Sequence, residues 1–400
     1  MRGTRGFRHV AVALVAAAAG CQDAPPADVI PLGLLLSYSG ALAANSVNSE
    51  RAVLLAIEAA NRAGGVAGRR LRVLARDTRS DPSRVTAPAR QLVDANVALF
   101  IGPDTTELAV QLKELLGNHT LIMPSFTTAS NFSKPYPWFV MGAPASRVAC
   151  ELAAQMRLAG RTHPLILVDP NGYNSLLGSE LAFRYGIPQA FLPSSESSND
   201  TTVRPITAMG ADAYVLAALP RAASAVLYAM AVVGALDDPG RWYLSPTLHT
   251  PALLENIPQG LLTGARGVAT GKVAGAQDFR DQFQTRWQDQ PLDDAFPFYD
   301  AAAVAVLALQ RAMTQEREIP VGTGLGKHIV GVTHAGGAPV GWNEIGRGLD
   351  LLRQGQEIAY IGLSGPLEFD VVGQSRAANI NWWTIGAGGF EDVPRTGECH

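Results

Sequence analysis

The sequence predicts an α/β protein in which doubly wound parallel sheets form two lobes. Apolar runs of strand length alternate with segments of helical periodicity, which is the pattern of a parallel sheet covered by helices. The alternation occurs in two series, before and after about residue 140, and no Gly/Ser-rich linker separates them. The 400 residues exceed one ordinary domain, and 47% of them are hydrophobic, enough for a sizeable core. Several crossings of the chain between two lobes would account for the missing linker.

The first series opens with a strand over Val29–Leu36 and a helix that buries Val53, Ile57 and Ala60. A second strand is expected over residues 71–75. The next helix is expected over residues 83–95, where Pro88 should kink it or delay its start, because proline lacks the N–H that an interior helical position needs.

Residues 96–130 contain a complete β-α-β unit. Residues 97–101 form an apolar run, and Asp104 and Glu107 follow in the D-x-x-E spacing that caps a helix. Gly117 stands where that helix should stop, and Leu121–Met123 predicts the next strand. A right-handed crossover makes the two strands parallel neighbours in one sheet.

Hydroxyl side chains follow both strands of this unit: Thr105 and Thr106 after the first, Ser125 and Thr127 after the second. Ligands of open α/β sheets bind at this edge, where the free N–H groups of a helix start favour an anion. Hydroxyls and N–H groups without Lys or Arg suit a carboxylate better than a phosphate. The alternative is that these residues only cap helices and form turns.

The remaining elements repeat the alternation. Helices are expected over residues 146–158, 176–185 and 222–233, and strands over residues 165–168, 213–218 and 242–244. An apolar helix from residue 297, an irregular segment over residues 319–341, a helix over residues 342–354 and a last strand over residues 379–385 complete the chain.

Several activities are excluded by composition and motifs. The formal net charge is −3, so no basic surface for nucleic acid is expected. The seven His are scattered and no zinc, nucleophile-elbow or cofactor motif occurs, so we expect no metal site, no cofactor and no enzyme. Residues 321–328 look superficially like a phosphate loop but have His328 in place of the Ser/Thr, and a flexible surface loop is expected. Asp293 and Asp294 are expected to be solvated.

Residues 1–21 predict a signal peptide. Arg2, Arg5 and Arg8 precede an apolar run that is too short to cross a bilayer. The residues before Cys21 resemble the lipobox of bacterial lipoproteins, in which that cysteine is acylated, although Ala18 stands where Leu is usual, so cleavage without a lipid remains the alternative. Without the leader, 29 basic residues face 35 acidic ones. Residues 22–28 form a short tether, and the protein is expected to be exported, periplasmic and held at the membrane by lipid only.

Two cysteines remain after the leader, Cys150 and Cys399. An oxidising compartment permits a disulfide between them, or they remain two free thiols.

Seven short segments, in this order and spacing, resemble the extracytoplasmic solute-binding proteins of branched-chain amino-acid uptake systems, the Leu/Ile/Val-binding type. They are LLSYSG, NRAGGVAGRR, RDTRSDP, IGPDTT, PSFTTAS (residues 124–130), FYDA and SGPLEFD. The resemblance implies two α/β lobes joined by three crossings, which close over a ligand in the cleft. It places lobe 1 at residues 29–143 and 271–377, and lobe 2 at residues 144–270 and 378–400.

The resemblance also implies a ligand site. Thr106 would meet the ligand's carboxylate, with Ser125 and Thr127 completing that half of the pocket. Tyr173 would cover the ligand from lobe 2, and Tyr38 would line the cleft from the first turn. For Tyr173 the alternative is a packed loop tyrosine.

Two positions depart from the family pattern. Leu219 stands where the family has a Tyr, and Thr247 stands where the family has a Glu that pairs with the ligand's ammonium group. Burying an ammonium without an acid is costly. Asp169 and Asp300 are candidate substitutes, or else cap and turn residues. The ligand is therefore left open between an amino acid, an amide and another small carboxylate.

Three functions follow. The first is capture of a small amino-acid-like ligand by lobe closure and delivery to an ABC permease. The second is ligand sensing by a receptor-type binding protein without a transport role. The third is an exported protein whose cleft no longer binds, which Leu219 and Thr247 keep open.

Overall fold

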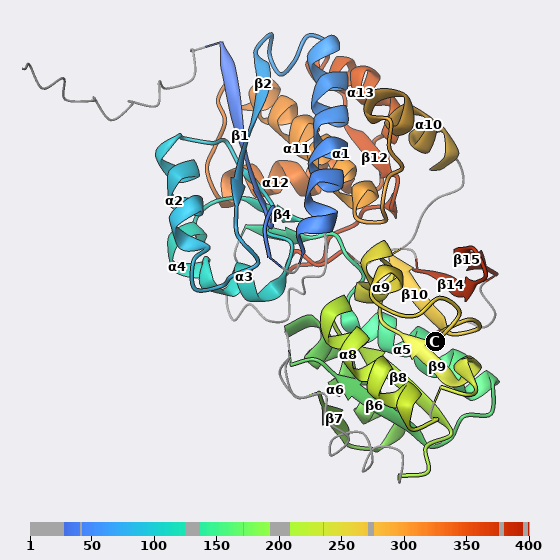
Figure 1. Cartoon of the computed structure of the whole chain (residues 1–400). Coiled ribbons are helices and arrows are strands. Elements are labelled where there is room, and N and C mark those ends of the chain that lie inside the picture. Colours follow the sequence, from blue (N-terminus) through green and yellow to red (C-terminus); the bar gives the residue numbers. More distant parts are fainter. Residues whose placement is uncertain are drawn as a thin grey trace, which may run out of the picture.

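The computed structural model describes residues 28–40, 42–124, 137–170, 172–192, 209–234, 236–270, 276–375, 380–394 and 399. Within these residues the chain forms two α/β lobes (Figure 1). The predicted leader, its Cys21 and nearly all of the tether lie outside the described residues, as do Ser125 and Thr127.

The upper lobe in Figure 1 is built on a five-stranded parallel sheet in the order β2-β1-β3-β4-β5. This is the doubly wound order expected of an open α/β sheet. Its strands are β1 (Val29–Leu36), β2 (Arg70–Asp77), β3 (Phe100–Ile101), β4 (Leu121–Met123) and β5 (Trp138–Val140), and its first helices are α1 (Ala43–Arg62), α2 (Thr86–Asp94), α3 (Thr106–Gln111) and α4 (Lys113–Leu116).

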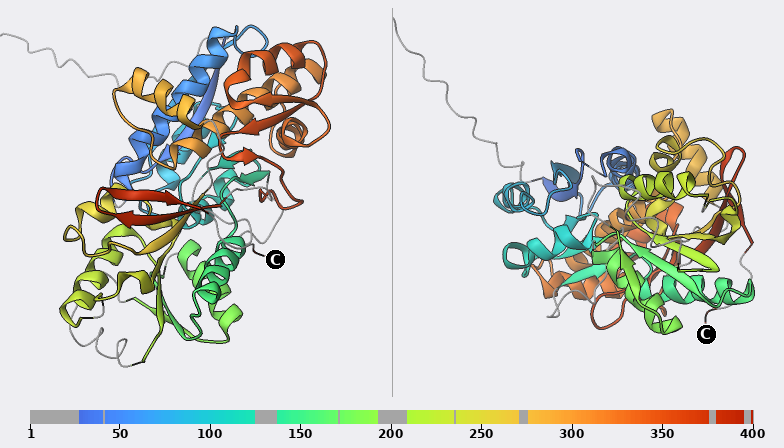
Figure 2. Two further views of the ribbon diagram at one scale, coloured as in Figure 1. Left: turned by 90° about the vertical axis from the view of Figure 1, so that its right-hand side faces the viewer. Right: turned by 60° about the horizontal axis from the view of Figure 1, so that its bottom comes forward.

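The lower lobe contains a seven-stranded sheet in the order β15-β14-β10-β9-β8-β6-β7. Strands β6 to β10 are parallel, whereas β14 and β15 form an antiparallel edge, seen in dark red in Figure 2. The elements are α5 (Ala145–Leu158), β6 (Pro164–Val168), α6 (Gly172–Tyr185), β7 (Gln189–Phe191), β8 (Ala213–Ala217), α8 (Pro220–Val232), η2 (Pro239–Arg241), β9 (Trp242–Leu244), η3 (Pro246–Leu248), α9 (Pro251–Glu255), β10 (Arg266–Thr270), β14 (Ile380–Gly386) and β15 (Gly389–Val393).

Later residues return to the upper lobe and complete its core. Helix α11 (Ala295–Gln315) is buried along most of its length and packs against α1. Its run of Ala and Val allows this close packing of helices on a sheet. Around it lie α10 (Ala276–Trp287), α12 (Thr323–Thr333), α13 (Ile345–Arg353), the short helix η4 (Trp342–Glu344) and a small sheet of β11 (Ala338–Gly341), β12 (Ile358–Gly362) and β13 (Gly365–Pro366).

The chain passes between the lobes three times: between β5 and α5, between β10 and α10, and between residue 375 and β14. This confirms the two-lobed, parallel-sheet architecture with three crossings. Each lobe has apolar clusters on both faces of its sheet. The exact lobe boundaries stay a prediction.

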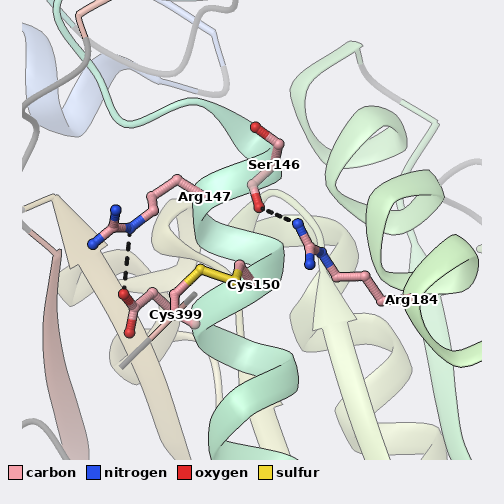
Figure 3. Close-up of a disulfide and its surroundings, with 6 residues drawn as sticks. Ser146, Arg147, Cys150, Arg184 and Cys399 are labelled. Atoms are coloured by element: carbon pink, nitrogen blue, oxygen red, sulfur yellow. Dashed lines mark hydrogen bonds and ion pairs between the residues drawn. A yellow bond between two sulfur atoms is a disulfide. The ribbon is translucent and has the colours of Figure 1, made fainter. Parts of the chain in front are cut away.

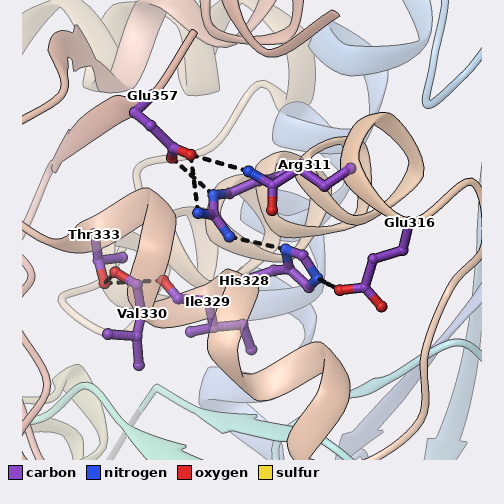
Figure 4. Close-up of polar contacts among 8 residues, drawn as sticks. Arg311, Glu316, His328, Ile329, Val330, Thr333 and Glu357 are labelled. Carbon is purple, nitrogen blue, oxygen red and sulfur yellow. Dashed lines mark hydrogen bonds and ion pairs between the residues drawn. The ribbon is translucent and has the colours of Figure 1, made fainter. Parts of the chain in front are cut away.

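One stretch of the expected secondary structure was wrong. The segment over residues 319–341, expected to be irregular with a flexible surface loop over residues 321–328, contains α12 and β11, and Leu325, Ile329 and Val332 of α12 are fully buried. These residues have helical spacing, and the glycines between them obscured the pattern. His328 is buried on this helix, where its Nδ1 accepts from Arg311 Nη1 at 3.0 Å and its Nε2 contacts Glu316 Oε1 at 2.6 Å (Figure 4).

Two further boundaries moved. Strand β3 is shorter than the expected residues 97–101, although Ala98 still donates its N–H to Pro31 in the neighbouring β1. Helix α2 starts at Thr86, the late start that Pro88 predicted.

The structure joins Cys150 on α5 to Cys399 by a disulfide, with the two Cα atoms 5.5 Å apart (Figure 3). The bond fixes the end of the chain to the lower lobe. Beside it, Arg147 pairs with the buried Glu151 at 3.4 Å, and Arg184 donates to the Ser146 carbonyl at 3.4 Å.

Candidate functional site

The start of α3 carries the two threonines predicted to meet a ligand. Thr105 is the N-cap and its Oγ1 accepts the N–H of Leu108 at 3.5 Å, while Thr106 is the first helical residue and is buried. The predicted D-x-x-E cap is therefore wrong in its first residue: Thr105, and not Asp104, is the N-cap, while Glu107 lies on the first turn and interacts with Thr105. Both carboxylates also have partners from distant parts of the chain.

Asp104 turns toward the end of β1. Its carboxylate accepts from the Ser37 N–H at 3.2 Å and from the Ser37 hydroxyl at 3.1 Å, and that hydroxyl lies 2.8 Å from Thr78 Oγ1. Burial raises the pKa of Asp104 to about 6, despite the hydrogen bonds from Ser37. The carboxyl ends of β1, β2 and β3 are thereby joined through side chains.

Glu107 crosses to the lower lobe. Its Oε1 accepts the backbone N–H of Gly172, the first residue of α6. A carboxylate at a helix start is stabilised by the helix dipole. Burial raises the pKa of Glu107, and the nearby Asp169 adds to this. The contact places the start of α3, with Thr106, opposite the start of α6, with Tyr173.

Tyr173 belongs to the apolar cluster between the lower sheet and its helices, and only 3% of its surface is exposed. Burial raises its pKa. The structure therefore agrees with the alternative of a packed tyrosine, and its role over a ligand stays a prediction.

Thr247 is also buried, on η3. Its Oγ1 lies 2.7 Å from both the Ala218 carbonyl and the Ser245 hydroxyl, and 3.3 Å from Asn174 Oδ1. Because a hydroxyl has one hydrogen and the Ala218 carbonyl can only accept, Thr247 donates there. What Thr247 has left to offer a ligand is an acceptor lone pair.

A second set of contacts joins the lobes next to Thr247. Thr250 donates to Asn45 Oδ1 at 3.3 Å, Asn45 donates to Asp294 Oδ2 at 3.0 Å, and His249 Nδ1 contacts Asp293. All five residues line a small polar cavity together with Thr247. Asp293 and Asp294, expected to be solvated, are instead largely buried at the lobe junction, because the second lobe covers them.

The remaining predicted residues lie in different parts of the fold. Tyr38 is half-buried against the upper core, and burial raises its pKa. Leu219 lies before α8, and its N–H donates to Asp169 Oδ2 at 3.2 Å, so Asp169 stays at this edge. Asp300 does not: it is fully buried in the upper lobe. Its carboxylate accepts from Tyr360 Oη, from the Leu363 N–H and from the N–H and hydroxyl of Ser364.

Glu107, Asn45 and Asp294 were not predicted as part of the site. The D-x-x-E spacing predicts only a local cap for Glu107, and the other two residues are separated by 249 positions in the sequence. No local pattern relates residues that far apart. Among the described residues, no group of acidic, His or Cys side chains could hold a metal ion, and no helix is long and apolar enough to cross a membrane.

Two lobes whose hydroxyl-bearing sheet edges face each other define a ligand-binding protein of the type I periplasmic binding fold. The family model described as periplasmic binding protein matches residues 29–319. The chain belongs to this family, whose members are exported, periplasmic binding proteins.

Among curated proteins, a chemotactic signal transduction system substrate-binding protein of Halobacterium salinarum is 26% identical, over 84% of this chain and 81% of its own length. Among solved structures, a leucine-binding protein from Thermotoga maritima aligns with a TM-score of 0.75 and 13% identity, over 91% of this chain and 98% of its own. A solute-binding protein from R. palustris in complex with benzoate aligns with a TM-score of 0.69 and 14% identity, over 91% and 96%. The structural similarities establish the fold.

Proposed function

We propose that this chain is a periplasmic solute-binding lipoprotein that captures a small carboxylate ligand, amino-acid-like in size, by lobe closure and delivers it to an ABC permease. The observation that carries the proposal is the contact of Glu107 with Gly172, which sets Thr106 opposite α6 across the lobes. Ligand contacts from both lobes favour the closed arrangement over an open one.

The surroundings of Thr106 favour a ligand that has a carboxylate group. Thr106 is the first residue of α3, where N–H groups and the helix dipole favour an anion, although the Glu107 carboxylate on the same turn competes for these N–H groups. The ligand's other end decides its class. Thr247 supplies no charge, whereas Asp169 lies close enough to Glu107 for its charge to contribute, after burial, to the raised pKa of Glu107. An amino acid would need one of these acids, while a carboxylate without an amine would need neither.

Calorimetric titration of the chain from Gln22 onward, against single amino acids and small carboxylates such as benzoate, tests the proposal. Thr106→Ala should abolish the binding of any hit, whereas Thr323→Ala, a threonine at the exposed start of α12, should leave it unchanged. A folded protein that binds nothing in a broad panel would contradict the proposal, as would a hit that tolerates Thr106→Ala.

Sensing is a second candidate function, because the Halobacterium relative is a substrate-binding protein of a chemotaxis system. Uptake of the labelled hit by cells with and without the chain separates the two functions. Lost uptake supports delivery to a permease, whereas normal uptake with a lost behavioural response supports sensing.

A further inference from the structure

A groove on the upper lobe is lined by four arginines, outside the site described above. Arg76 comes from the end of β2, Arg79 from the turn after it, and the other two, Arg84 and Arg90, lie just before α2 and on it. The acids in the lining are Asp77 and Asp94. The groove therefore carries excess positive charge on a chain whose formal net charge is −3.

Two of these arginines form no ion pair with another described residue. Among the described residues, neither Arg79 nor Arg90 makes a side-chain hydrogen bond or ion pair, and both are exposed. Arg76 is held by neutral acceptors, Gln91 Oε1 at 2.7 Å and the Ala75 carbonyl at 2.8 Å. Arg84 pairs with Asp81 at 3.2 Å. Three guanidinium groups in one groove thus lack a carboxylate in ion-pair contact, although Arg79 lies close enough to Asp81 for their charges to interact.

The turn that presents Arg79 is held in an unfavourable backbone conformation. Arg79 and Ser80 have φ values of 62° and 52°, in the left-handed region that disfavours side chains other than glycine. Asp77 Oδ1 accepts the Arg79 N–H at 2.8 Å, and Ser80 Oγ donates to the Ser39 carbonyl at 3.1 Å. The fold maintains this turn against its local preference.

The same turn is bonded to the loop that enters the ligand site. Ser39 donates its hydroxyl to Asp77 Oδ2 at 2.7 Å, and the Leu42 N–H donates to Ser80 Oγ at 3.2 Å. This loop follows β1 and includes Ser37 and Tyr38. A partner seated in the groove would therefore contact a turn whose position is tied to the ligand loop.

The groove lies at the carboxyl end of β2, whereas the chain enters the lobe at Val29, which pairs with Arg70 at the other end of the strand. Seven residues of strand separate the two ends by about 23 Å. The groove and the point where the described chain enters the lobe thus lie at opposite ends of β2.

We propose that the four-arginine groove is a docking surface for an acidic segment of a partner protein. Carboxylates of that segment would pair with Arg79 and Arg90, and with Arg76 in the same groove, since guanidinium groups bind carboxylates with two parallel hydrogen bonds. The proposal extends the proposed function, because either a permease or a sensor requires such a partner.

The test uses a fluorescently labelled hexaglutamate peptide, with its binding to the chain followed by anisotropy at low ionic strength. Arg79→Gln with Arg90→Gln should weaken binding by about tenfold or more, and added salt should reduce the difference. The matched control is Arg72→Gln with Arg221→Gln, which removes two exposed arginines outside the groove and should leave binding unchanged.

Three results would overturn the proposal: no binding of hexaglutamate to the unaltered chain, equal weakening in the control pair, or tighter, Arg79- and Arg90-dependent binding of inorganic phosphate or of vesicles rich in anionic lipid. Urea unfolding of each variant verifies that the fold is intact. Small-ligand titration of the same variants keeps this test separate from the proposed function, because Arg79 and Arg90 lie outside the ligand site.

Discussion

Glu107, on the first turn of α3, accepts the backbone N–H of Gly172 at the start of α6. One residue thus connects two helices from different lobes at their amino ends, where the first N–H groups of a helix have no partner within the helix itself. Thr106 directly precedes Glu107 in the sequence, and Tyr173 directly follows Gly172. Contact between the lobes and ligand binding are therefore expected to depend on each other.

Glu107→Gln should weaken this connection, because the neutral amide interacts less with the helix dipole than a carboxylate does. The expected loss is about 0.5–1 kcal/mol of interaction between the lobes. Small-angle X-ray scattering of the ligand-free variant should give a larger radius of gyration than the unaltered chain. Glu114→Gln, at an exposed position on α4, is the control. Identical radii for all three proteins would contradict the role assigned to Glu107.

Asp104 should make stability depend on pH. Its pKa is about 6 in the fold against 3.8 for a free side chain, so folding favours its protonated form. The stabilisation is fully present below about pH 4 and is lost as the pH rises through 6, about 3 kcal/mol in all. Asp104→Asn removes this loss, so from pH 4 to 7 the variant should gain stability relative to the unaltered chain. Urea unfolding across that range measures it; parallel curves would refute the assignment.

Asp300→Ala should destabilise the upper lobe by about 3 kcal/mol or more. The change leaves the buried N–H groups of Leu363 and Ser364 without the acceptor that now holds them at 2.8 and 2.7 Å. Asp350→Ala is the control, since Asp350 is exposed and its pair with Arg353 is worth less than about 1 kcal/mol. The two variants should unfold at clearly different denaturant concentrations. Similar midpoints would show that Asp300 has no special role.

Replacing both Cys150 and Cys399 by Ser should lower the free energy of unfolding by about 3 kcal/mol, because the disulfide closes a long loop in the unfolded chain. The two cysteines are 249 positions apart. Thermal unfolding with and without reductant provides the check. Reductant should lower the midpoint of the unaltered chain and leave the double variant unaffected; an equal response of both proteins would argue against the bond.

The sequence by itself determined the class of fold. Apolar runs such as Val29–Leu36 and Leu121–Met123 form buried strands. Strands that alternate with helices can be connected in only a few ways, so the local sequence pattern was enough to predict parallel sheets. The sequence pattern gave a wrong prediction over residues 321–328, because glycines concealed the start of a helix whose apolar stripe packs against the upper core.

Only the tertiary structure decided what the polar side chains do. Asp104 and Glu107 have the spacing of a helix cap, yet one bonds to Ser37 and the other to Gly172, 65 residues away. Asp300 resembled a candidate ligand partner and is a buried structural acceptor, while Asp294 resembled a solvated residue and lies at the lobe junction. A carboxylate takes whichever donors the fold brings near it, because the cost of burying it unpaired exceeds any local preference. Those donors come from distant segments, so the sequence pattern does not contain them.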